Sequence, residues 1–296
     1  MEILTPLPQR FRLGIAGIRL CIDTDQCLMA TSEFLPFLQD AGAADVCAVF
    51  RRVETLPPIP ERVLHEDNCY RVHPDGKGGY LRSFFDAPRD MTPYAVASYD
   101  YDGGNIRVDY LSKGARCVSE MHNSFFHLGF EALLISRKRL CLHASCVDTP
   151  LGGILFSGPS GIGKSTQAEL WCDYRGAEQI NGDRPILSME TEGWLAWGSP
   201  YAGSSGCHVN KSCPVTAVVM LKQGPVCTLR RLGLPEAFRA IWSGLTMHSW
   251  NARLVECASD LTMDLLRTVP VFEFSCTPDW QAVDYLELQL RKELAL

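Results

Sequence analysis

A glycine-rich stretch at residues 158 to 165, GPSGIGKS, constrains this chain more than any other segment. It fits the pattern G-x-x-x-x-G-K-[ST] and stands between an apolar run, Ile154–Phe156, and a helical pattern that begins at Thr166. In such a strand, loop and helix, the glycines let backbone N–H groups converge on phosphate oxygens, and the helix N-terminus adds positive charge. Lys164 is expected to neutralise the outer phosphates, and the Ser165 hydroxyl to ligate Mg²⁺. The stretch predicts a site for ATP with Mg²⁺, formed by Gly158, Ser160, Gly161, Ile162, Gly163, Lys164, Ser165 and Thr166.

The motif is specific for a binding loop, although it does not specify a reaction. At ordinary frequencies of glycine, lysine, serine and threonine, a chance match in a chain of this length arises about once in a hundred chains. The alternative is a glycine-rich turn from strand to helix that binds no ligand. Such a turn has no need of the Lys164–Ser165 pair.

Composition narrows the class of protein and of partner. The formal net charge is −6 over 296 residues, and no cluster of Lys and Arg stands out, so we expect no nucleic-acid partner. No apolar window approaches 18 residues, which predicts a soluble, cytoplasmic protein without a membrane partner. The 13 cysteines include no Cys-x-x-Cys pair, so free buried thiols are expected rather than a zinc site or a disulfide framework.

The first part of the chain, residues 1–116, has the pattern of strands and turns. Apolar alternations surround Gly17 and run from Val46 to Phe50. The segments 73–80 and 99–111 place Asp-Gly and Gly-Gly between β-rich runs, which predicts hairpins. We interpret these residues as a strand-rich N-terminal domain.

Residues 117–296 are expected to form a second, α/β domain around the glycine-rich loop. Helical spacing from Val118 to Arg139 predicts one helix that leads into it. The predicted strands are 140–147, 152–157, 214–221 and 269–276. Further helices are expected over 235–268, with an interruption near Ser249, and after Pro278.

Asp183 is the nearest acidic residue downstream of the loop that could serve as a base or a metal ligand. Ordinary P-loop hydrolases place an Asp after an apolar strand, and no other segment here offers a good example. Asp183 follows a short segment, EQIN, whose only aliphatic residue is Ile180. A lone Asp in such a place is by default a turn or cap residue. Its distance from the loop makes it the candidate nonetheless.

The segment from His143 to Asp183 resembles the core of the HPr kinase/phosphorylase group, bacterial P-loop kinases whose catalytic fold is similar to phosphoenolpyruvate carboxykinase. In that group a strand carries a His about 15 residues before the phosphate loop, as His143 stands before Gly158. An Asp-Asp element follows the next strand, where this chain has Gly182 and Asp183. The resemblance implies a P-loop kinase core with a mixed, twisted sheet over residues 117–296.

The resemblance also implies roles for these residues. Asp183 is the expected general base and a ligand of Mg²⁺ together with Ser165, Lys164 balances the developing charge, and His143 orients the phosphoryl group or the acceptor. A strand histidine that bonds a backbone carbonyl is the alternative for His143. Lys211 lies in a Gly/Ser-rich segment, 197–214, which is either a mobile loop over the nucleotide, with Lys211 on a phosphate, or an ordinary surface loop.

The predicted function is ATP-dependent phosphorylation of a hydroxyl on a peptide, protein or small molecule, with a serine as the expected acceptor residue. The segment with which the group contacts the protein HPr is not visible in 234–250, so HPr itself is not the expected acceptor. Two alternatives remain open: a partner-coupled nucleoside-triphosphate hydrolase, and a nucleotide-sensing or scaffolding module without catalysis. The sequence leaves the oligomeric state open, a homo-oligomer included.

Overall fold

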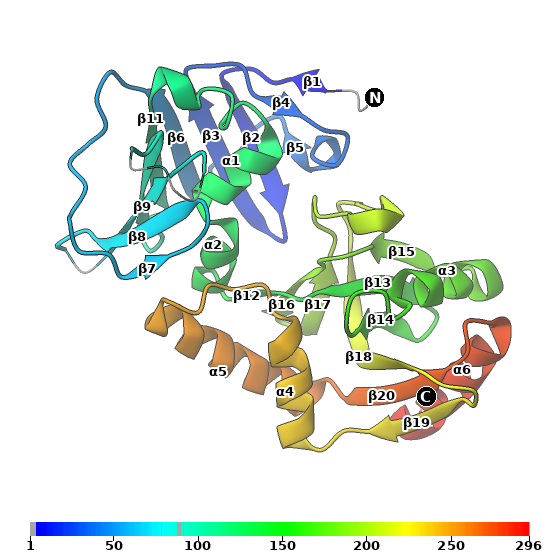
Figure 1. The fold of residues 1–296 in the computed structure, drawn as a ribbon. Coiled ribbons are helices and arrows are strands. Elements are labelled where there is room, and N and C mark those ends of the chain that lie inside the picture. Colours follow the sequence, from blue (N-terminus) through cyan, green and yellow to red (C-terminus); the bar gives the residue numbers. More distant parts are fainter. Residues whose placement is uncertain (1–3, 78, 88–89, 91, 296) are drawn as a thin grey trace. The chain divides into compact units, whose positions relative to one another are not determined.

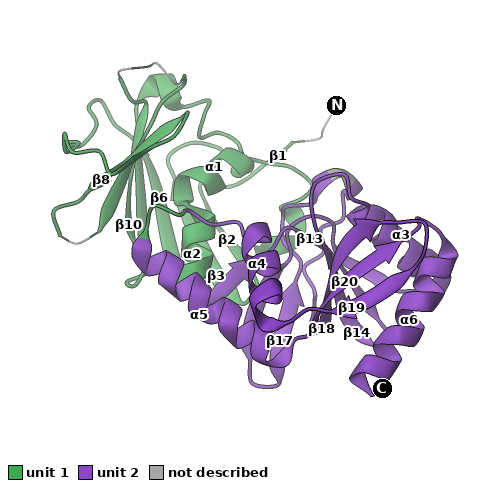
Figure 2. Cartoon of the chain, turned by 60° about the horizontal axis from the view of Figure 1, so that its bottom comes forward, with its two compact units in different colours: residues 1–136, 249–251 green, residues 137–248, 252–296 purple. Residues whose placement is uncertain are grey.

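The computed structural model describes residues 4–77, 79–87, 90 and 92–295. The chain divides into two compact units, Met1–Ser136 with Ser249–Asn251, and Arg137–His248 with Ala252–Leu296 (Figure 2). The sequence places the domain boundary at residue 116, whereas the structure keeps the following helical segment with the first unit. None of the helices in the described ranges is long and apolar enough to cross a membrane.

The first unit is built on one large sheet with the strand order β5-β2-β3-β6-β11-β10-β9-β8-β7 (Figure 1). β6 lies parallel to both β3 and β11, and the other neighbours in the sheet are antiparallel. A small sheet pairs β1 with β4. The strands are β1 Thr5–Pro6, β2 Arg10–Ile15, β3 Ile18–Thr24, β4 Met29–Ala30, β5 Leu38–Gln39, β6 Val46–Arg52, β7 His65–Glu66, β8 Tyr70–Pro74, β9 Tyr80–Phe84, β10 Ala95–Asp100 and β11 Asn105–Tyr110.

The strand-rich character of this part is confirmed, and its turns follow the predicted chemistry. Gly17 has φ +75° and joins β2 to β3, and the 99–111 segment is the β10–β11 hairpin with Asp100 opposite Asn105. Val46, Ala48 and Phe50 are buried on one face of β6, as a period of two residues requires.

The helix expected from Val118 to Arg139 is two helices, α1 Met121–Leu128 and α2 Phe130–Ser136. Gly129 separates them with φ +59°, and its N–H donates to the carbonyls of Phe125 and Phe126, which ends α1. Arg139 lies in a strand rather than at a helix C-terminus. The prediction of a single helix was wrong. Gly129 ends the first helix, but the spacing of the apolar residues continues into the second, so the sequence pattern does not show the break.

The second unit has a mixed sheet with the order β12-β16-β17-β18-β14-β13-β15, and β20 pairs with β18 and β19. β14, β18 and β20 run parallel to one another, so their carboxyl ends lie at one edge. The elements are β12 Arg139–Cys141, β13 Ala144–Thr149, β14 Gly152–Ser157, α3 Lys164–Arg175, β15 Glu178–Asn181, β16 Ile186–Glu190, β17 Gly193–Trp197, β18 Ser212–Gln223, β19 Thr228–Arg231, α4 Leu234–Gly244, α5 Ala252–Thr268, β20 Val271–Cys276 and α6 Trp280–Leu294.

The core of this unit lies between the sheet and two helices, α3 and α6. Trp171 of α3 is fully buried, with its ring 6.5 Å from Phe156 of β14, and Tyr285 of α6 stacks on Phe274 of β20 at 6.2 Å. Asp279 caps α6 by accepting from the N–H groups of Gln281 and Ala282. The α/β class is confirmed. The packing of α3 on the sheet holds the N-terminus of this helix near the carboxyl ends of the parallel strands β14, β18 and β20.

Candidate functional site

The glycine-rich loop joins β14 to α3, the strand and helix that the motif predicted. Gly158, Gly161 and Gly163 have φ of +140°, +77° and +113°, a region that other residues rarely adopt. A Cβ added at Gly161 or Gly163 would meet nothing within 4 Å. The backbone at these two glycines therefore lines open space.

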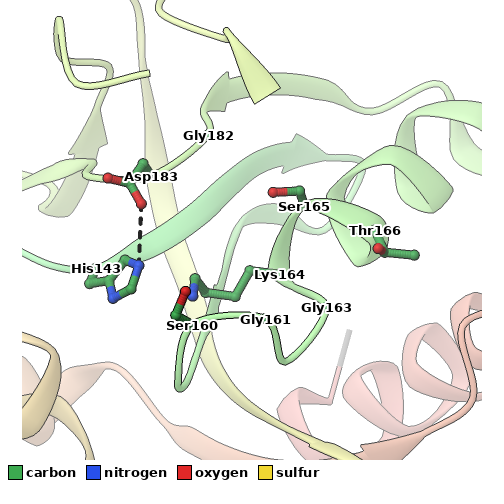
Figure 3. Close-up of a pocket in the computed structure, with 9 residues that line it drawn as sticks. All are labelled: His143, Ser160, Gly161, Gly163, Lys164, Ser165, Thr166, Gly182 and Asp183. Carbon is green, nitrogen blue, oxygen red and sulfur yellow. Dashed lines mark ion pairs between the residues drawn. The ribbon is translucent and has the colours of Figure 1, made fainter. Parts of the chain in front are cut away.

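A cavity of about 240 Å³ lies over this loop (Figure 3). Its walls are mostly polar, and they bring the loop together with two segments from elsewhere in the sequence. Eight of the predicted site residues line it, together with Gly182: His143, Ser160, Gly161, Gly163, Lys164, Ser165, Thr166 and Asp183.

His143 and Asp183 both line this cavity and pair with each other, with His143 Nε2 3.2 Å from Asp183 Oδ1 (Figure 3). Their meeting is a consequence of backbone pairing. Ala144 N–H donates to the carbonyl of Asp183 at 2.9 Å, and Ser145 Oγ donates to the carbonyl of Gly182 at 2.8 Å. These bonds hold the start of β13 against the turn that follows β15.

The strand predicted over 140–147 is interrupted at Leu142 and His143, between β12 and β13. Here the backbone leaves the regular ladder, because Leu142 N–H donates to Pro185 O and His143 N–H donates to Gly244 O at 2.8 Å. His143 therefore lies between β12 and β13 rather than within a strand, and its ring pairs with the Asp183 carboxylate.

Asn181 positions Asp183, a role that the sequence analysis missed. Its side chain is fully buried, and its Oδ1 accepts from the N–H groups of Asp183 and Arg184 at 3.0 and 2.7 Å. Its Nδ2 donates to the carbonyl of Ser199 at 3.0 Å. The order Asn-Gly-Asp was the available signal, since an Asn side chain often bonds the backbone two residues later.

Charge in the cavity is arranged around Asp183. Its Oδ2 lies 3.4 Å from Arg184 Nε, an ion pair without hydrogen-bond geometry, and Arg184 lies over the Tyr201 ring at 5.6 Å. Burial lowers the pKa of Lys164, an effect that the nearby Asp183 charge partly offsets. Burial, and then the Lys164 charge, lower the pKa of His143, so its imidazole is neutral near pH 7.

Lys164 is 8% exposed, and its Nζ donates to the carbonyls of Gly158 and Pro159, each at 3.2 Å. The ammonium therefore lies folded back on its own loop (Figure 3). Gly158 does not line the cavity, and its carbonyl instead accepts a hydrogen bond from Lys164. Ile162 lies against a second cavity, on another side of the loop.

Lys211 lies outside this cavity, and its Nζ pairs with Glu178 Oε1 at 2.5 Å. The Gly/Ser-rich segment packs instead against the turn that carries Asp183. A Cβ added at Gly203 would come within 2.6 Å of Asp183 Cβ, and Gly182 N–H donates to Cys207 O. The segment is thus a wall behind Asp183.

The donor set suits Mg²⁺ shared with a substrate better than a metal held by protein alone. Across the described ranges, no group of three or more His, Cys, Asp and Glu side chains is placed to hold a metal ion. Mg²⁺ is usually held by one or two carboxylates or hydroxyls together with phosphate oxygens and water. Ser165 and Asp183, which line one cavity, are residues of that kind.

The chain matches no model of a known protein family, and no curated protein matches it. Among solved structures it is similar to the Hpr(Ser) kinase/phosphatase from Coxiella burnetii. The similarity has 15% sequence identity and a TM-score of 0.33, and it covers 53% of this chain and 99% of that chain. It is a distant structural relationship.

Proposed function

We propose that the protein is a kinase that transfers the γ-phosphoryl group of ATP to a hydroxyl of a peptide, protein or small molecule. One observation carries the proposal: the His143–Asp183 pair lines the same 240 Å³ cavity as Lys164 and Ser165 of the glycine-rich loop. A phosphate loop alone supports binding. A carboxylate beside it, held by an imidazole, adds a group that can accept a proton from an acceptor.

In the proposed reaction the acceptor O–H gives its proton to Asp183 as its oxygen bonds to the γ-phosphorus. The bond between that phosphorus and the bridging oxygen breaks, and ADP leaves with the electron pair. Neutral His143 donates its Nε2–H to Asp183 and keeps the carboxylate turned toward the cavity. Lys164 moves from the carbonyls of Gly158 and Pro159 to the phosphate oxygens, where its charge balances the transition state. Mg²⁺, held by Ser165 and Asp183, would supply further charge compensation.

Asp183→Asn is the sharpest test, because the amide keeps the shape of the side chain and loses the base. We expect ATP binding to remain within about twofold, while transfer falls at least ~100-fold, the low end for loss of a general base. Asp173→Asn, on the exposed face of α3, makes the same change of charge in the same unit and should leave transfer unchanged.

The assay uses γ-labelled ATP with Mg²⁺ and a lysate of the host, and follows the label in wild type, Asp183→Asn and Asp173→Asn. Label in a discrete peptide, protein or metabolite that disappears in Asp183→Asn supports the kinase. Label found only as free phosphate indicates a hydrolase, and label that stays in bound ATP indicates a sensing module. Transfer that Asp183→Asn leaves unchanged contradicts the role of Asp183 as base.

A further inference from the structure

Two cysteines of the first unit lie side by side on neighbouring strands of its large sheet. β3 and β6 run parallel, and their register places Cys21 directly opposite Cys47. The alternate residues Leu20 and Ile22 of β3 and Val46 of β6 are buried. Since successive side chains of a strand point to opposite faces, Cys21 and Cys47 project together from the other face of the sheet.

The spacing of these two cysteines suits a disulfide. Directly opposed residues of neighbouring strands lie roughly 5 Å apart at Cα, within the range of about 4.4–6.8 Å that disulfides require. Another pair of thiols shows what this requirement excludes. Cys146 Sγ and Cys213 Sγ are 3.9 Å apart in the second unit, but β14 separates their strands, β13 and β18. Two strand spacings amount to roughly 10 Å, which is too far for a bond unless the backbone moves.

The two thiols of the first unit differ in their access to solvent. Cys47 is exposed, unlike the buried thiols that the composition predicts, whereas Cys21 is 3% exposed. An oxidant in solution therefore meets Cys47 first, and Cys21 is the sheltered thiol beside it. Redox-sensitive cysteines combine these features, an accessible thiol with a second, resolving thiol within reach. The buried Cys146 and Cys213 offer no accessible member.

Positive charge lies beside the pair, on the neighbouring strand β2 (Figure 1). Arg12 stands directly opposite Cys21, and its Nε is buried without a hydrogen-bond partner among the described residues. The Arg10 guanidinium interacts with the Cys21 side chain, which raises the pKa of Arg10. Asp23, two residues further along β3, is already paired with Arg51 at 2.9 Å. Reactive cysteines are found in electropositive, partly exposed surroundings of this kind.

We propose that Cys21 and Cys47 form a site of reversible oxidation, at which a peroxide converts the two thiols into a disulfide. The Cys47 sulfur attacks one peroxide oxygen, the O–O bond breaks, and Cys47 becomes a sulfenic acid as one water leaves. The Cys21 sulfur then attacks the Cys47 sulfur, and the sulfenic oxygen leaves as a second water. The two thiols lose two electrons and two protons, which the peroxide takes up. A dithiol reductant reverses the change by thiol–disulfide exchange.

Hydrogen peroxide tests the proposal on the purified, reduced chain. After the reaction, free thiols are alkylated in denaturant, and the unreduced peptides are mapped by mass spectrometry. We expect a Cys21–Cys47 linkage as the main product, which dithiothreitol removes, while Cys146 and Cys213 are alkylated. The proposal is overturned if Cys21 and Cys47 remain thiols, or if Cys47 advances to the sulfinic acid while Cys21 stays reduced. An equal amount of Cys146–Cys213 linkage overturns the argument from strand spacing on which it rests.

Three variants separate the parts that the two thiols take. Cys47→Ser should abolish the linkage and leave Cys21 a thiol at the same peroxide concentration, because the accessible partner is gone. Cys21→Ser should let a sulfenic acid accumulate on Cys47, where dimedone traps it. Cys27→Ser, at an exposed cysteine of the same unit, is the matched control and should leave the linkage unchanged.

Trapping of Cys47 to the same extent with and without Cys21 contradicts the resolving role of Cys21. Where Cys21→Ser does not fold, the wild-type peptide map and Cys47→Ser decide the proposal. These outcomes are independent of the kinase test, because the oxidation is measured without nucleotide or acceptor.

Discussion

Gly182 is the residue that the sequence analysis compared with the first acid of an Asp-Asp element, and the structure gives a physical reason for a glycine here. A Cβ at this position would overlap Ser205 Oγ and come within 2.6 Å of the carbonyl oxygen of Ala202. The turn at Gly203–Ser205 therefore occupies the space that a second carboxylate would need. In the proposed mechanism Asp183 acts as the single acid of this element, helped by His143.

Gly182→Asp, which recreates the acid pair, should lower stability by about 1–3 kcal/mol, the usual cost of overpacking, and should not increase phosphoryl transfer. The Ala202 carbonyl belongs to the backbone and cannot turn aside. Ser205→Gly in the same chain should restore only part of the stability. Urea unfolding and the labelling assay on the single and double variants measure both effects. A Gly182→Asp variant that is as stable as wild type and transfers phosphate faster would show that the segment around Ala202 and Ser205 can move to make room for the new side chain.

The loop residues could be predicted from the sequence, because a single local pattern carries both their chemistry and their conformation. Asn181 and the carbonyl of Gly244 could not, since they act through hydrogen bonds to Asp183 and His143 that only the folded chain creates. Lys211 was a candidate phosphate contact because of its residue type and its Gly/Ser-rich surroundings, with an ordinary surface loop as the alternative. The structure places its ammonium on Glu178 Oε1, outside the cavity over the glycine-rich loop.

At the scale of elements, the break between α1 and α2 depends on one glycine in a crowded place. A Cβ at Gly129 would lie 2.5 Å from the Tyr101 hydroxyl and 3.2 Å from Arg82 Nη1, in addition to the cost of φ +59°. Arg82 is 1% exposed and its guanidinium lies 4.2 Å from the centre of the Tyr70 ring, so it has little room to move.

Gly129→Ala should therefore destabilise the protein by more than the ~1 kcal/mol that a left-handed alanine costs. Gly176→Ala is the control. Gly176 ends α3 with φ +61°, and a Cβ there meets nothing within 4 Å, so the variant isolates the backbone cost. Free energies of unfolding from urea titrations compare the two. A loss at Gly129 no greater than that at Gly176 would mean that the surrounding side chains make room.

Strands with one clear period were predictable, and β14 was predicted with the bounds 152–157 that the structure has. The interruption between β12 and β13 was not, because apolar residues continue through Leu142 while the backbone bonds turn to other segments. Burial patterns record which side chains face the core. They do not record where each N–H finds its partner.

At the scale of the whole molecule, stability is expected to depend on pH through buried histidines of the first unit. His127 is 1% exposed, its Nδ1–H donates to Asn123 O at 2.6 Å, and its Nε2 accepts from the Tyr94 hydroxyl at 2.9 Å. Burial lowers the pKa of His127 from 6.5 to about 4. Burial also lowers the pKa of His73.

Because the unfolded chain binds the proton of His127 more readily, its contribution is fully present above pH 6.5 and is lost as the pH falls toward 4. Between pH 7 and pH 5 the expected loss from this residue is about 2 kcal/mol. His127→Gln, which keeps a donor and an acceptor, should remove that part of the pH dependence and leave the part due to His73. Urea unfolding of both proteins at several pH values gives the comparison. If the stability of wild type and of His127→Gln changed with pH in the same way, the lowered pKa of His127 would be contradicted.

One short segment, between Gly244 and Trp250, joins the second unit to the first. Gly244, whose carbonyl accepts from His143 N–H, and Trp250, whose ring lies 5.2 Å from Tyr80 in the first unit, are six positions apart in the sequence. Six residues reach at most roughly 20 Å when fully extended. The five residues between them are therefore a short covalent link between a residue of the first unit and the carbonyl that binds the His143 backbone in the second. The length of this link limits how far Trp250 can lie from Gly244.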